Sequence, residues 1–276
     1  MSQALAPARG TARPPVKLRR VFAAAARSEW IKLRTVRSTI WALVLTIAFT
    51  IGLGALFTAI EVSRWDTRTP TEVSGFDPLL YSFAGLNLAQ LSIGVLGVLV
   101  MTSEYSTRTI KLTLGATPQR PVLLAAKVAT FSAVVAVIGL ASCFAAFWVC
   151  QALLAPKHAG LSISDPGVLR AVIGGAVHLV LVGAIAVALG ALIRRTAGAV
   201  AVLFAVLLVI PGLVTLLPAP WNNDITRYLP NSAGAAMSAV GRFPNLLSPA
   251  GGLIVLCAYT AAALVLAALA LTRRDA

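Results

Sequence analysis

Residues 169–217 read LRAVIGGAVHLVLVGAIAVALGALIRRTAGAVAVLFAVLLVIPGLVTLL, which is two apolar runs divided by Arg194 and Arg195. A helix needs about 20 apolar residues to cross the hydrocarbon core of a bilayer. Each run reaches that length without an acidic residue. The stretch therefore predicts two membrane-spanning helices, over 169–193 and 198–217, joined by a short basic turn.

Four more apolar runs lie outside this stretch, and the composition agrees with them. Hydrophobic residues make up 58% of the 276 and charged residues 12%, whereas a soluble domain carries about a quarter charged residues. We predict an all-α integral membrane protein with six transmembrane helices between residues 39 and 272. The third span is longer than a bilayer requires, so it is expected to tilt or to emerge into water. The additional spans are expected at 39–60, 81–102, within 122–154 and at 250–272.

The basic residues are distributed unequally along the chain. An even number of spans places both termini on one side, together with the loop 103–121 and the turn at Arg194 and Arg195. That side holds 17 basic and 3 acidic residues, whereas the other side holds 6 of each, so one side carries the whole net charge of +14. Lys and Arg in short loops favour the cytoplasm, so both termini, including a tail at 273–276, are expected there. The charge thus indicates topology, and no nucleic-acid partner is predicted.

The residues before the first span divide into two parts. Residues 1–19 are basic and contain several prolines and alanines, which predicts a disordered tail. Residues 20–38 repeat apolar side chains at three- and four-residue steps. This pattern predicts an amphipathic helix in the cytoplasmic interface, against membrane lipids; a solvated helix that anchors by charge is the alternative. The apolar stripe consists of Phe22, Ala26, Trp30 and Leu33.

Residues 218–249, before the last span, are interrupted by prolines. Within them, residues 231–242 are apolar and small, and are too few to cross a bilayer. We predict a short outer helix or re-entrant segment here. Asn231 or Ser232 is the expected N-cap, because both side chains accept hydrogen bonds from the first backbone N–H groups of a helix.

The chain shows no pattern typical of an enzyme. It contains no GxxxxGK[ST] phosphate-binding loop and no GxSxG nucleophile motif. Neither His158 nor His178 has a Cys, Asp or Glu at metal-ligand spacing. We therefore expect no catalytic, cofactor-binding or metal-binding residue. Any energy source must then be an ion gradient or a partner protein.

Few polar groups lie within the predicted spans. His178 is the one titratable group well inside them, whereas Lys127 is expected to snorkel to the cytoplasmic face. Asn87 and Gln90 share one helix face. These two residues and His178 are interpreted either as polar helix-packing residues or as part of a pathway. Because gradient-driven carriers place ionisable groups deep in their spans, the scarcity favours an external motor that contacts the loop 103–121.

Residues 102–127 read TSEYSTRTIKLTLGATPQRPVLLAAK. This stretch resembles the first cytoplasmic loop of type-2 ABC transporter permeases, the membrane subunits of many bacterial exporters. In that family an acidic residue ends the second span, a Thr–Ile or Thr–Leu pair and a Pro-x-Arg turn follow, and a basic residue opens the third span. The matching residues here are Glu104, Thr109, Ile110, Pro118, Arg120 and Lys127. Arg108 departs from the pattern, because a glycine commonly precedes the threonine.

Two further patches carry the resemblance. SEWIKLRTVRSTIW (28–41) is similar to the helix before the first span, especially in actinobacterial members, and YLPNSAGAAM (228–237) is similar to the outer segment before the last span. The likeness implies an export permease in the bacterial plasma membrane that pairs with a second permease copy or homologue. It also implies a separate ABC-type ATPase that hydrolyses ATP. The implied ATPase-coupling residues are Glu104, Arg108, Thr109, Ile110, Pro118 and Arg120.

Two other classes of function share this topology. A non-transporting membrane protein, such as an immunity, sensor or scaffold protein, would need the spans but no pathway. A gradient-driven carrier would need a pathway, but it is disfavoured by the scarcity of ionisable groups in the spans. For a transporter, an apolar pathway with few fixed charges favours amphiphilic substrates.

Overall fold

The computed structural model describes residues 18–69, 72–73, 75–107, 120–219, 221–241, 243 and 245–273. Every regular element in these ranges is helical. The predicted all-α membrane fold is confirmed, because six helical segments are long and apolar enough to cross a membrane, and each overlaps its predicted range. These segments are Arg37–Ser63, Pro78–Ser106, Arg120–Lys157, Val168–Ile193, Thr196–Val214 and Pro249–Arg273.

Several of the six spans are built from more than one helix. The first comprises α2 (Arg37–Ala48), a π-helical turn (Phe49–Leu53) and α3 (Gly54–Ser63), and the second comprises α5 (Pro78–Ser82) and α6 (Leu86–Ser106). The third is α8 (Arg120–Leu154) with a short 3-10 turn (Ala155–Lys157), and the fourth is α9 (Val168–Ile193). The fifth comprises α10 (Thr196–Phe204), a π-helical turn (Ala205–Val209) and α11 (Ile210–Val214), and the sixth is α14 (Pro249–Arg273).

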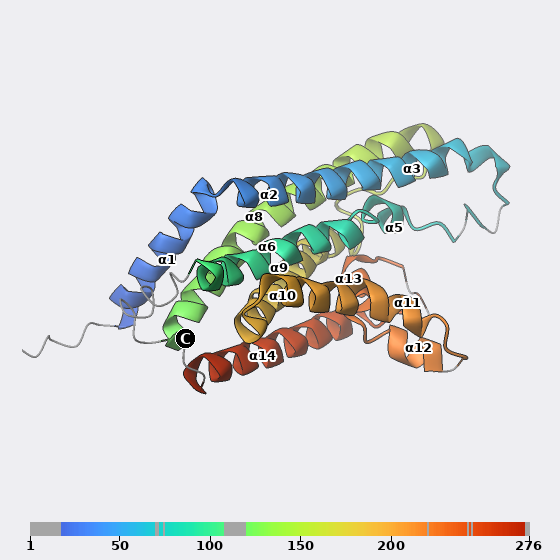
Figure 1. Ribbon diagram of the computed structural model, residues 1–276. Coiled ribbons are helices and arrows are strands. Elements are labelled where there is room, and N and C mark those ends of the chain that lie inside the picture. The colour runs from blue at the N-terminus through green and yellow to red at the C-terminus, as the bar shows by residue number, and fades with distance from the viewer. Residues whose placement is uncertain are drawn as a thin grey trace, which may run out of the picture.

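The third span is longer than the hydrocarbon core of a bilayer is thick. Helix α8 contains 35 residues, which corresponds to about 52 Å at 1.5 Å per residue. The hydrocarbon core of a bilayer is only about 30 Å thick. One end of α8 lies close to α1, and the other lies beside the end of α3 (Figure 1). The helix is therefore longer than a bilayer requires, as expected, and its tilt or emergence into water stays a prediction.

Helix α9 lies at the centre of the bundle. It packs against α6, α8 and α14. Of its most apolar stretch of 18 residues, 61% is buried, the largest share among the six spans. Small residues permit this packing: a Cβ atom at Gly97 of α6 would lie only 2.7 Å from the Gly183 carbonyl oxygen of α9. Membrane helices commonly use such small residues to approach closely. The first, fifth and sixth spans lie at the periphery and expose apolar side chains.

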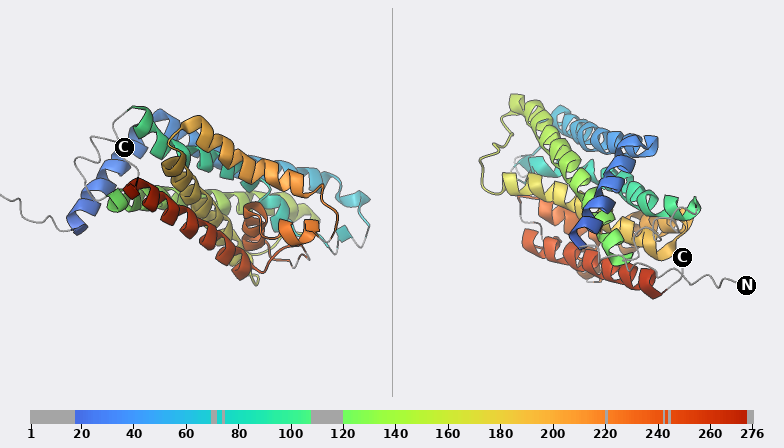
Figure 2. Two further views of the ribbon diagram at one scale, coloured as in Figure 1. Left: turned by 60° about the horizontal axis from the view of Figure 1, so that its bottom comes forward. Right: turned by 90° about the vertical axis from the view of Figure 1, so that its left-hand side faces the viewer.

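Helix α1 (Leu18–Thr35) precedes the first span and is set at an angle to it (Figures 1 and 2). The chain turns at Val36, whose φ of −81° and ψ of 120° are extended rather than helical. Leu33 is buried and Trp30 is exposed, so the predicted apolar stripe is divided between the protein and the outer surface. The amphipathic helix is thus observed, whereas its contact with lipids stays a prediction.

A short helix, α13 (Pro230–Ser238), enters the bundle between α9 and α14. Its backbone touches both neighbours, because a Cβ atom at Gly174 of α9 would overlap the Met237 carbonyl oxygen, and one at Gly252 of α14 would overlap the Ala233 oxygen. Arg170 of α9 donates to the carbonyl oxygens of Met237, at 3.3 Å, and Ala239, at 2.8 Å, which satisfies the C-terminal end of α13. The predicted short helix is therefore packed within the bundle.

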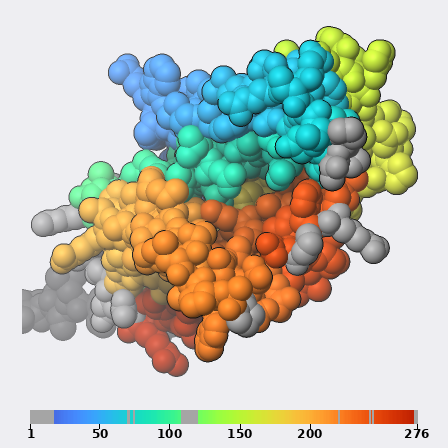
Figure 3. All heavy atoms as spheres, turned by 90° about the vertical axis from the view of Figure 1, so that its right-hand side faces the viewer, coloured from blue at the N-terminus to red at the C-terminus, as the bar shows by residue number. Residues whose placement is uncertain are grey.

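The end of the bundle opposite α1 is seen in Figure 3, with α3 and the residues after it in cyan and α11 and α12 (Trp221–Thr226) in orange. At the other end, the beginning of α1 lies near the end of α14 (Figure 1). The two ends of the described chain therefore lie at the same end of the bundle, as an even number of spans requires.

Candidate functional site

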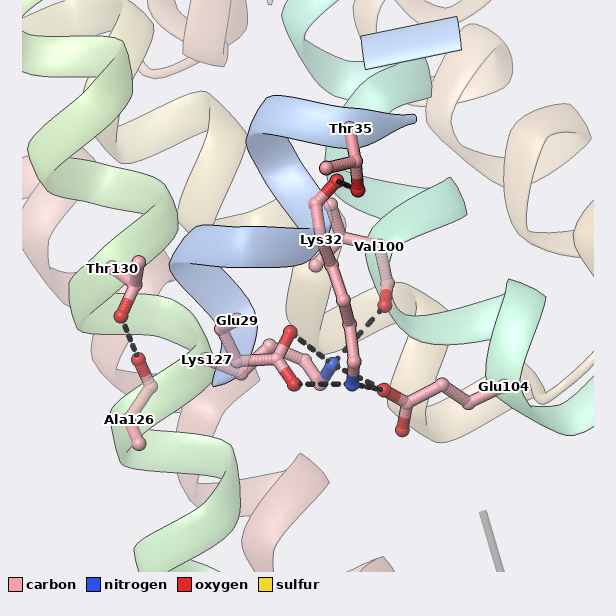
Figure 4. Close-up of polar contacts among 8 residues, drawn as sticks. All are labelled: Glu29, Lys32, Thr35, Val100, Glu104, Ala126, Lys127 and Thr130. Carbon is pink, nitrogen blue, oxygen red and sulfur yellow. Dashed lines mark hydrogen bonds and ion pairs between the residues drawn. The ribbon is translucent and has the colours of Figure 1, made fainter. Parts of the chain in front are cut away.

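Four charged side chains form an ion cluster at the end of the bundle that carries α1 (Figure 4). Glu29 and Lys32 belong to α1, Glu104 to α6 and Lys127 to α8. The Nζ atom of Lys127 donates to Glu29 Oε2 at 2.7 Å and to Glu104 Oε1 at 2.9 Å. The Nζ atom of Lys32 donates to Glu29 Oε1 at 2.7 Å and to Glu104 Oε1 at 2.5 Å. Each lysine bridges the same two carboxylates, so the cluster joins three helices.

Local helix geometry explains how these groups meet. Glu29 and Lys32 are three residues apart on α1, so their side chains lie on the same helix surface. Glu104 lies in the last turn of α6, and Lys127 lies near the beginning of α8. The cluster therefore connects the two ends of the loop 103–121 to each other and to α1.

Lys127 is enclosed by the protein, so the predicted snorkelling is wrong. Only 1% of its side chain is exposed, and its Nζ atom also donates to the Val100 carbonyl oxygen at 3.3 Å. A buried ammonium group is tolerated when it is paired and hydrogen-bonded. The partner Glu29 is 98 residues away in the sequence, whereas the Glu29–Lys32 spacing within SEWIK was a local signal that sequence reasoning missed.

The charges of the ion cluster balance, with two carboxylates and two ammonium groups. Lys32 lies at its rim, with 41% of its side chain exposed. Burial lowers the pKa of Lys32, but the hydrogen bonds and charges of Glu104 and Glu29 outweigh burial and raise it above its ordinary value. Stabilisation from Lys32 is therefore fully present at neutral pH and is lost only as pH rises through the raised pKa.

A polar seam, consisting of His178, Gln90, Asn231 and the Leu207 carbonyl, crosses the interior of the bundle. The Nε2 atom of His178 lies 3.0 Å from Gln90 Oε1. Gln90 Nε2 donates to Asn231 Oδ1 at 3.0 Å, and Asn231 Nδ2 donates to the Leu207 oxygen at 2.6 Å. The seam therefore joins α6, α9, α13 and the π-helical turn of the fifth span.

The Leu207 carbonyl, at one end of the polar seam, sets the direction of every hydrogen bond in it. A carbonyl oxygen only accepts, so the Leu207 oxygen requires Asn231 to present its Nδ2 group. The Oδ1 atom of Asn231 then accepts from Gln90, and Gln90 Oε1 accepts from the Nε2–H group of His178. The bond to Gln90 is therefore assigned as a donation from the Nε2–H group of His178.

Pro211 accounts for the availability of the Leu207 carbonyl. Proline has no N–H group, so it cannot donate to the carbonyl four residues earlier. The π-helical turn Ala205–Val209 immediately precedes α11, which contains Pro211, and the side chain of Asn231 supplies a donor. The predicted capping role of Asn231 is therefore wrong: α13 follows Leu229, and that N-cap position makes no side-chain hydrogen bond.

The three predicted polar residues of the spans have different surroundings. Gln90 and His178 are buried and bonded to each other, as expected of polar helix-packing residues. Asn87 is exposed, and its Nδ2 group donates to Ala84 O at 3.4 Å. Asn87 and His178 nevertheless line the same cavity of about 60 Å³, together with Asn231. Contact with a transported substrate stays a prediction for all three predicted residues.

We expect Asn231→Leu to destabilise the protein by about 1–3 kcal/mol, because it removes the side-chain donor to the Leu207 carbonyl. It also removes one of two acceptors of Gln90 Nε2, which still donates to the Asn87 oxygen at 3.3 Å. Pro211→Ala restores an N–H group within reach of Leu207, so the double variant should recover part of the loss. Unfolding by SDS titration in mixed micelles measures both effects. Asn223→Leu, at an exposed position of α12, is the control. Equal losses of stability in Asn231→Leu and Asn223→Leu would contradict the role of the seam.

The predicted loop residues are only partly described by the structure. Arg108, Thr109, Ile110 and Pro118 lie outside the described residues. Glu104 belongs to the ion cluster, and Arg120 begins α8. The Nη1 atom of Arg120 donates to the Leu271 carbonyl oxygen at 2.7 Å, and Nη2 of Arg194 donates to the Ala270 oxygen at 3.2 Å. Two guanidinium groups thus meet the last turns of α14.

Among the described residues, no group of three or more His, Cys, Asp or Glu side chains is placed to hold a metal ion. The ion cluster and the polar seam each consist of groups that bond to one another. No protein-family model matches the chain, and no curated protein matches it.

Proposed function

We propose that this chain is the transmembrane permease subunit of an ATP-driven ABC exporter, forming the translocation path and coupling to a separate ATPase subunit. The observation that supports this function most directly is the ion cluster. It ties both ends of the loop 103–121 to α1, through Glu104 on one side and Lys127 on the other. The same loop carries the resemblance to the coupling loop of type-2 permeases.

A coupling loop must pass a displacement to the spans rather than absorb it. Here α1, α6 and α8 are connected by buried ion pairs at the base of the loop, and α6 and α8 both pack against the central α9. Motion imposed on the loop would therefore move these helices together. In this proposal ATP hydrolysis belongs to the partner, and the coupling contacts are Glu104, Arg108, Thr109, Ile110, Pro118 and Arg120.

The placement of ionisable groups favours a motor over an ion gradient. Carriers that use a gradient need a titratable group accessible from the pathway. Glu104 and Lys127 are engaged in the ion cluster, and the Nε2 group of His178 is engaged by Gln90. A gradient-driven mechanism that used Glu104 or Lys127 would have to break the ion cluster in every cycle.

The proposal includes the bacterial plasma membrane, with both termini in the cytoplasm, and a second permease copy or homologue. The shared end of α1 and α14, with Arg120, Arg194 and Arg273 near it, supports the orientation through the positive-inside tendency. Exposed apolar side chains on the first, fifth and sixth spans leave surface for a membrane partner. A cysteine at position 225, in a background without the native cysteines, should react only with reagent added outside; labelling only from the cytoplasm would reverse the orientation.

For the coupling itself, we expect Glu104→Gln to lower permease-stimulated ATP hydrolysis by about fivefold or more, the scale of a typical coupling free energy. The change keeps the shape of the side chain but removes the charge that pairs with Lys32 and Lys127. The measurement is ATPase activity of the complex isolated from its native membrane and reconstituted in vesicles. Glu72→Gln, at an exposed carboxylate outside the cluster, is the matched control.

Two results of that experiment would count against the proposal. A tagged chain that retains no ABC-type ATPase during purification from its native membrane would favour the immunity, sensor or scaffold alternative. Stimulated hydrolysis that is unchanged in Glu104→Gln would remove the ion cluster from the coupling path, even if the ATPase is present.

A further inference from the structure

A cavity of about 500 Å³ lies where α9 and α14 begin and α13 ends. This end of the bundle is the one opposite α1, and it faces the viewer in Figure 3. The volume falls within the range of sites that bind drug-sized molecules. Most of the lining is apolar, so a ligand that fills the cavity needs an apolar part. The apolar lining residues include Val240, Phe243, Leu246, Leu247 and Pro249.

A single cationic side chain, that of Arg170 in the first turn of α9, also lines this cavity. Among the described residues that line it, Arg170 is the only one with a charge. Arg170 is exposed, and its hydrogen bonds go to the backbone carbonyl oxygens of Met237 and Ala239 rather than to a carboxylate. Its charge is therefore open to an anionic group that enters the cavity.

One carboxylate, that of Asp77, contacts the segment that lines the cavity. Its Oδ2 atom accepts from the N–H group of Gly241 at 3.2 Å, and its Oδ1 atom accepts from the N–H group of Leu79 at 2.9 Å. Asp77 itself lines a neighbouring cavity and not this one. Because both of its oxygens are bonded to backbone donors, Asp77 does not take the place of an anion beside Arg170.

The guanidinium group of Arg170 is held in position by the protein. Its Nη1 atom donates to the Met237 oxygen at 3.3 Å, and its Nη2 atom donates to the Ala239 oxygen at 2.8 Å. Arginine has five N–H groups, so these two bonds leave three for a ligand. Guanidinium groups bind planar and tetrahedral oxyanions through paired hydrogen bonds, and a group that is already positioned loses little freedom on binding. Arg170 can therefore hold an anion without releasing α13.

We propose that this cavity binds a single-tailed anionic amphiphile, with its apolar part against Val240, Phe243 and Leu246 and its anionic group at Arg170. The apolar lining and the single cationic residue match this class of ligand in polarity and in charge. The site shares no residue with the ion cluster or the polar seam. It does not depend on the proposed ATP-driven function.

The test uses the purified full-length chain in phosphatidylcholine nanodiscs, with an alkyl sulfonate that carries a photoreactive diazirine at the end of its chain. The label should be found within residues 236–249. Decyl sulfate should compete with the probe about tenfold more strongly than decanol, the scale of one hydrogen bond to a charged group. Equal competition by the two compounds would overturn the contact with Arg170. A label spread evenly over the exposed spans would show partition into the bilayer only, and would overturn the site.

Two variants of Arg170 separate its charge from its structural role. Arg170→Gln should remove most of the preference for decyl sulfate over decanol, whereas Arg170→Lys should keep it because lysine retains the positive charge. Both variants lose the paired donation to the end of α13. An equal loss of the preference in both would therefore assign Arg170 to the support of α13 and overturn the anion contact.

Leu246→Trp should reduce labelling within residues 236–249, because the larger ring occupies the cavity. Leu216→Trp is the matched control, since Leu216 is 80% exposed and does not line the cavity; it should be labelled as the wild type is. Unchanged labelling in Leu246→Trp would overturn the site.

The lipid of the nanodisc distinguishes the two sources of an anionic amphiphile. Labelling should persist when phosphatidylglycerol replaces phosphatidylcholine, because the proposed ligand has one tail and is smaller than a phospholipid. Suppression of the label by phosphatidylglycerol would assign the cavity to a lipid of the bilayer and overturn the proposed ligand. Because no ATPase is present in this experiment, its outcome is independent of the coupling assay.

Discussion

Replacing Lys127 with methionine is expected to lower the free energy of unfolding by about 3–5 kcal/mol, the usual cost of leaving a buried charge without its partner. The substitution keeps the length of the side chain but removes the ammonium group that bridges Glu29 and Glu104. Lys32 retains contact with both carboxylates, but it lies at the rim of the cluster and is partly exposed. Unfolding by SDS titration in mixed micelles provides the measurement.

Two companion variants make this result specific. Lys157→Met removes an ion pair with Asp66 at the surface, where 25% and 80% of the two side chains are exposed; its effect should stay below about 1 kcal/mol. The double variant Lys127→Met with Glu104→Gln removes one positive and one negative charge, and should be more stable than Lys127→Met alone. If Lys127→Met costs no more than Lys157→Met, the ion cluster does not hold α1, α6 and α8 together.

The second large effect is expected from Gly174→Ala, which should destabilise the protein by about 3 kcal/mol. A Cβ atom at this position of α9 would overlap the Met237 carbonyl oxygen of α13. Backbone cannot rotate away as a flexible side chain can, so α13 must shift from its place between α9 and α14. The same SDS titration measures the loss of stability.

Gly52→Ala is the appropriate comparison, because a Cβ atom there meets no atom within 4 Å. Replacing a helical glycine with alanine in open space is expected to be neutral or to stabilise by up to about 1 kcal/mol. Opposite signs for Gly174→Ala and Gly52→Ala would establish the close backbone contact. Similar values for the two would mean that α13 is not packed against Gly174.

The spans were predictable from sequence because each depends on a property of consecutive residues. The Arg194 and Arg195 pair, for example, separates two apolar runs, and the structure ends α9 at Ile193 and begins α10 at Thr196. The amphipathic segment before the first span was predictable for the same reason. Its orientation was less predictable. Leu33 belongs to the buried core, whereas Trp30 is exposed, and periodicity alone does not distinguish a surface that faces protein from one that faces lipid.

The candidate sites were less predictable because their partners are distant in the sequence. Lys127 was expected at the membrane surface on the basis of its side-chain length, and its pairing with Glu29 across 98 residues has no local signal. Asn231 illustrates the same difficulty. Its position near a helix start favours capping, but its side chain instead satisfies the Leu207 carbonyl of another span. Pro211 supplies no N–H group to the Leu207 carbonyl, and nothing near it in the sequence indicates which donor replaces it.

The polar seam has a mechanical consequence. Each of its hydrogen bonds sets the direction of the next, from the Leu207 oxygen through Asn231 and Gln90 to His178. A 180° flip of the side-chain amide of Gln90 or Asn231 would bring donor against donor and acceptor against acceptor. One hydrogen bond of the seam therefore cannot be reversed without a cost in free energy at its neighbours. Separation of α6 from α9 and α13 at this depth is therefore a concerted step with an energy threshold. The fifth span lies at the periphery, but it belongs to the same polar seam, because its Leu207 carbonyl accepts the hydrogen bond from Asn231.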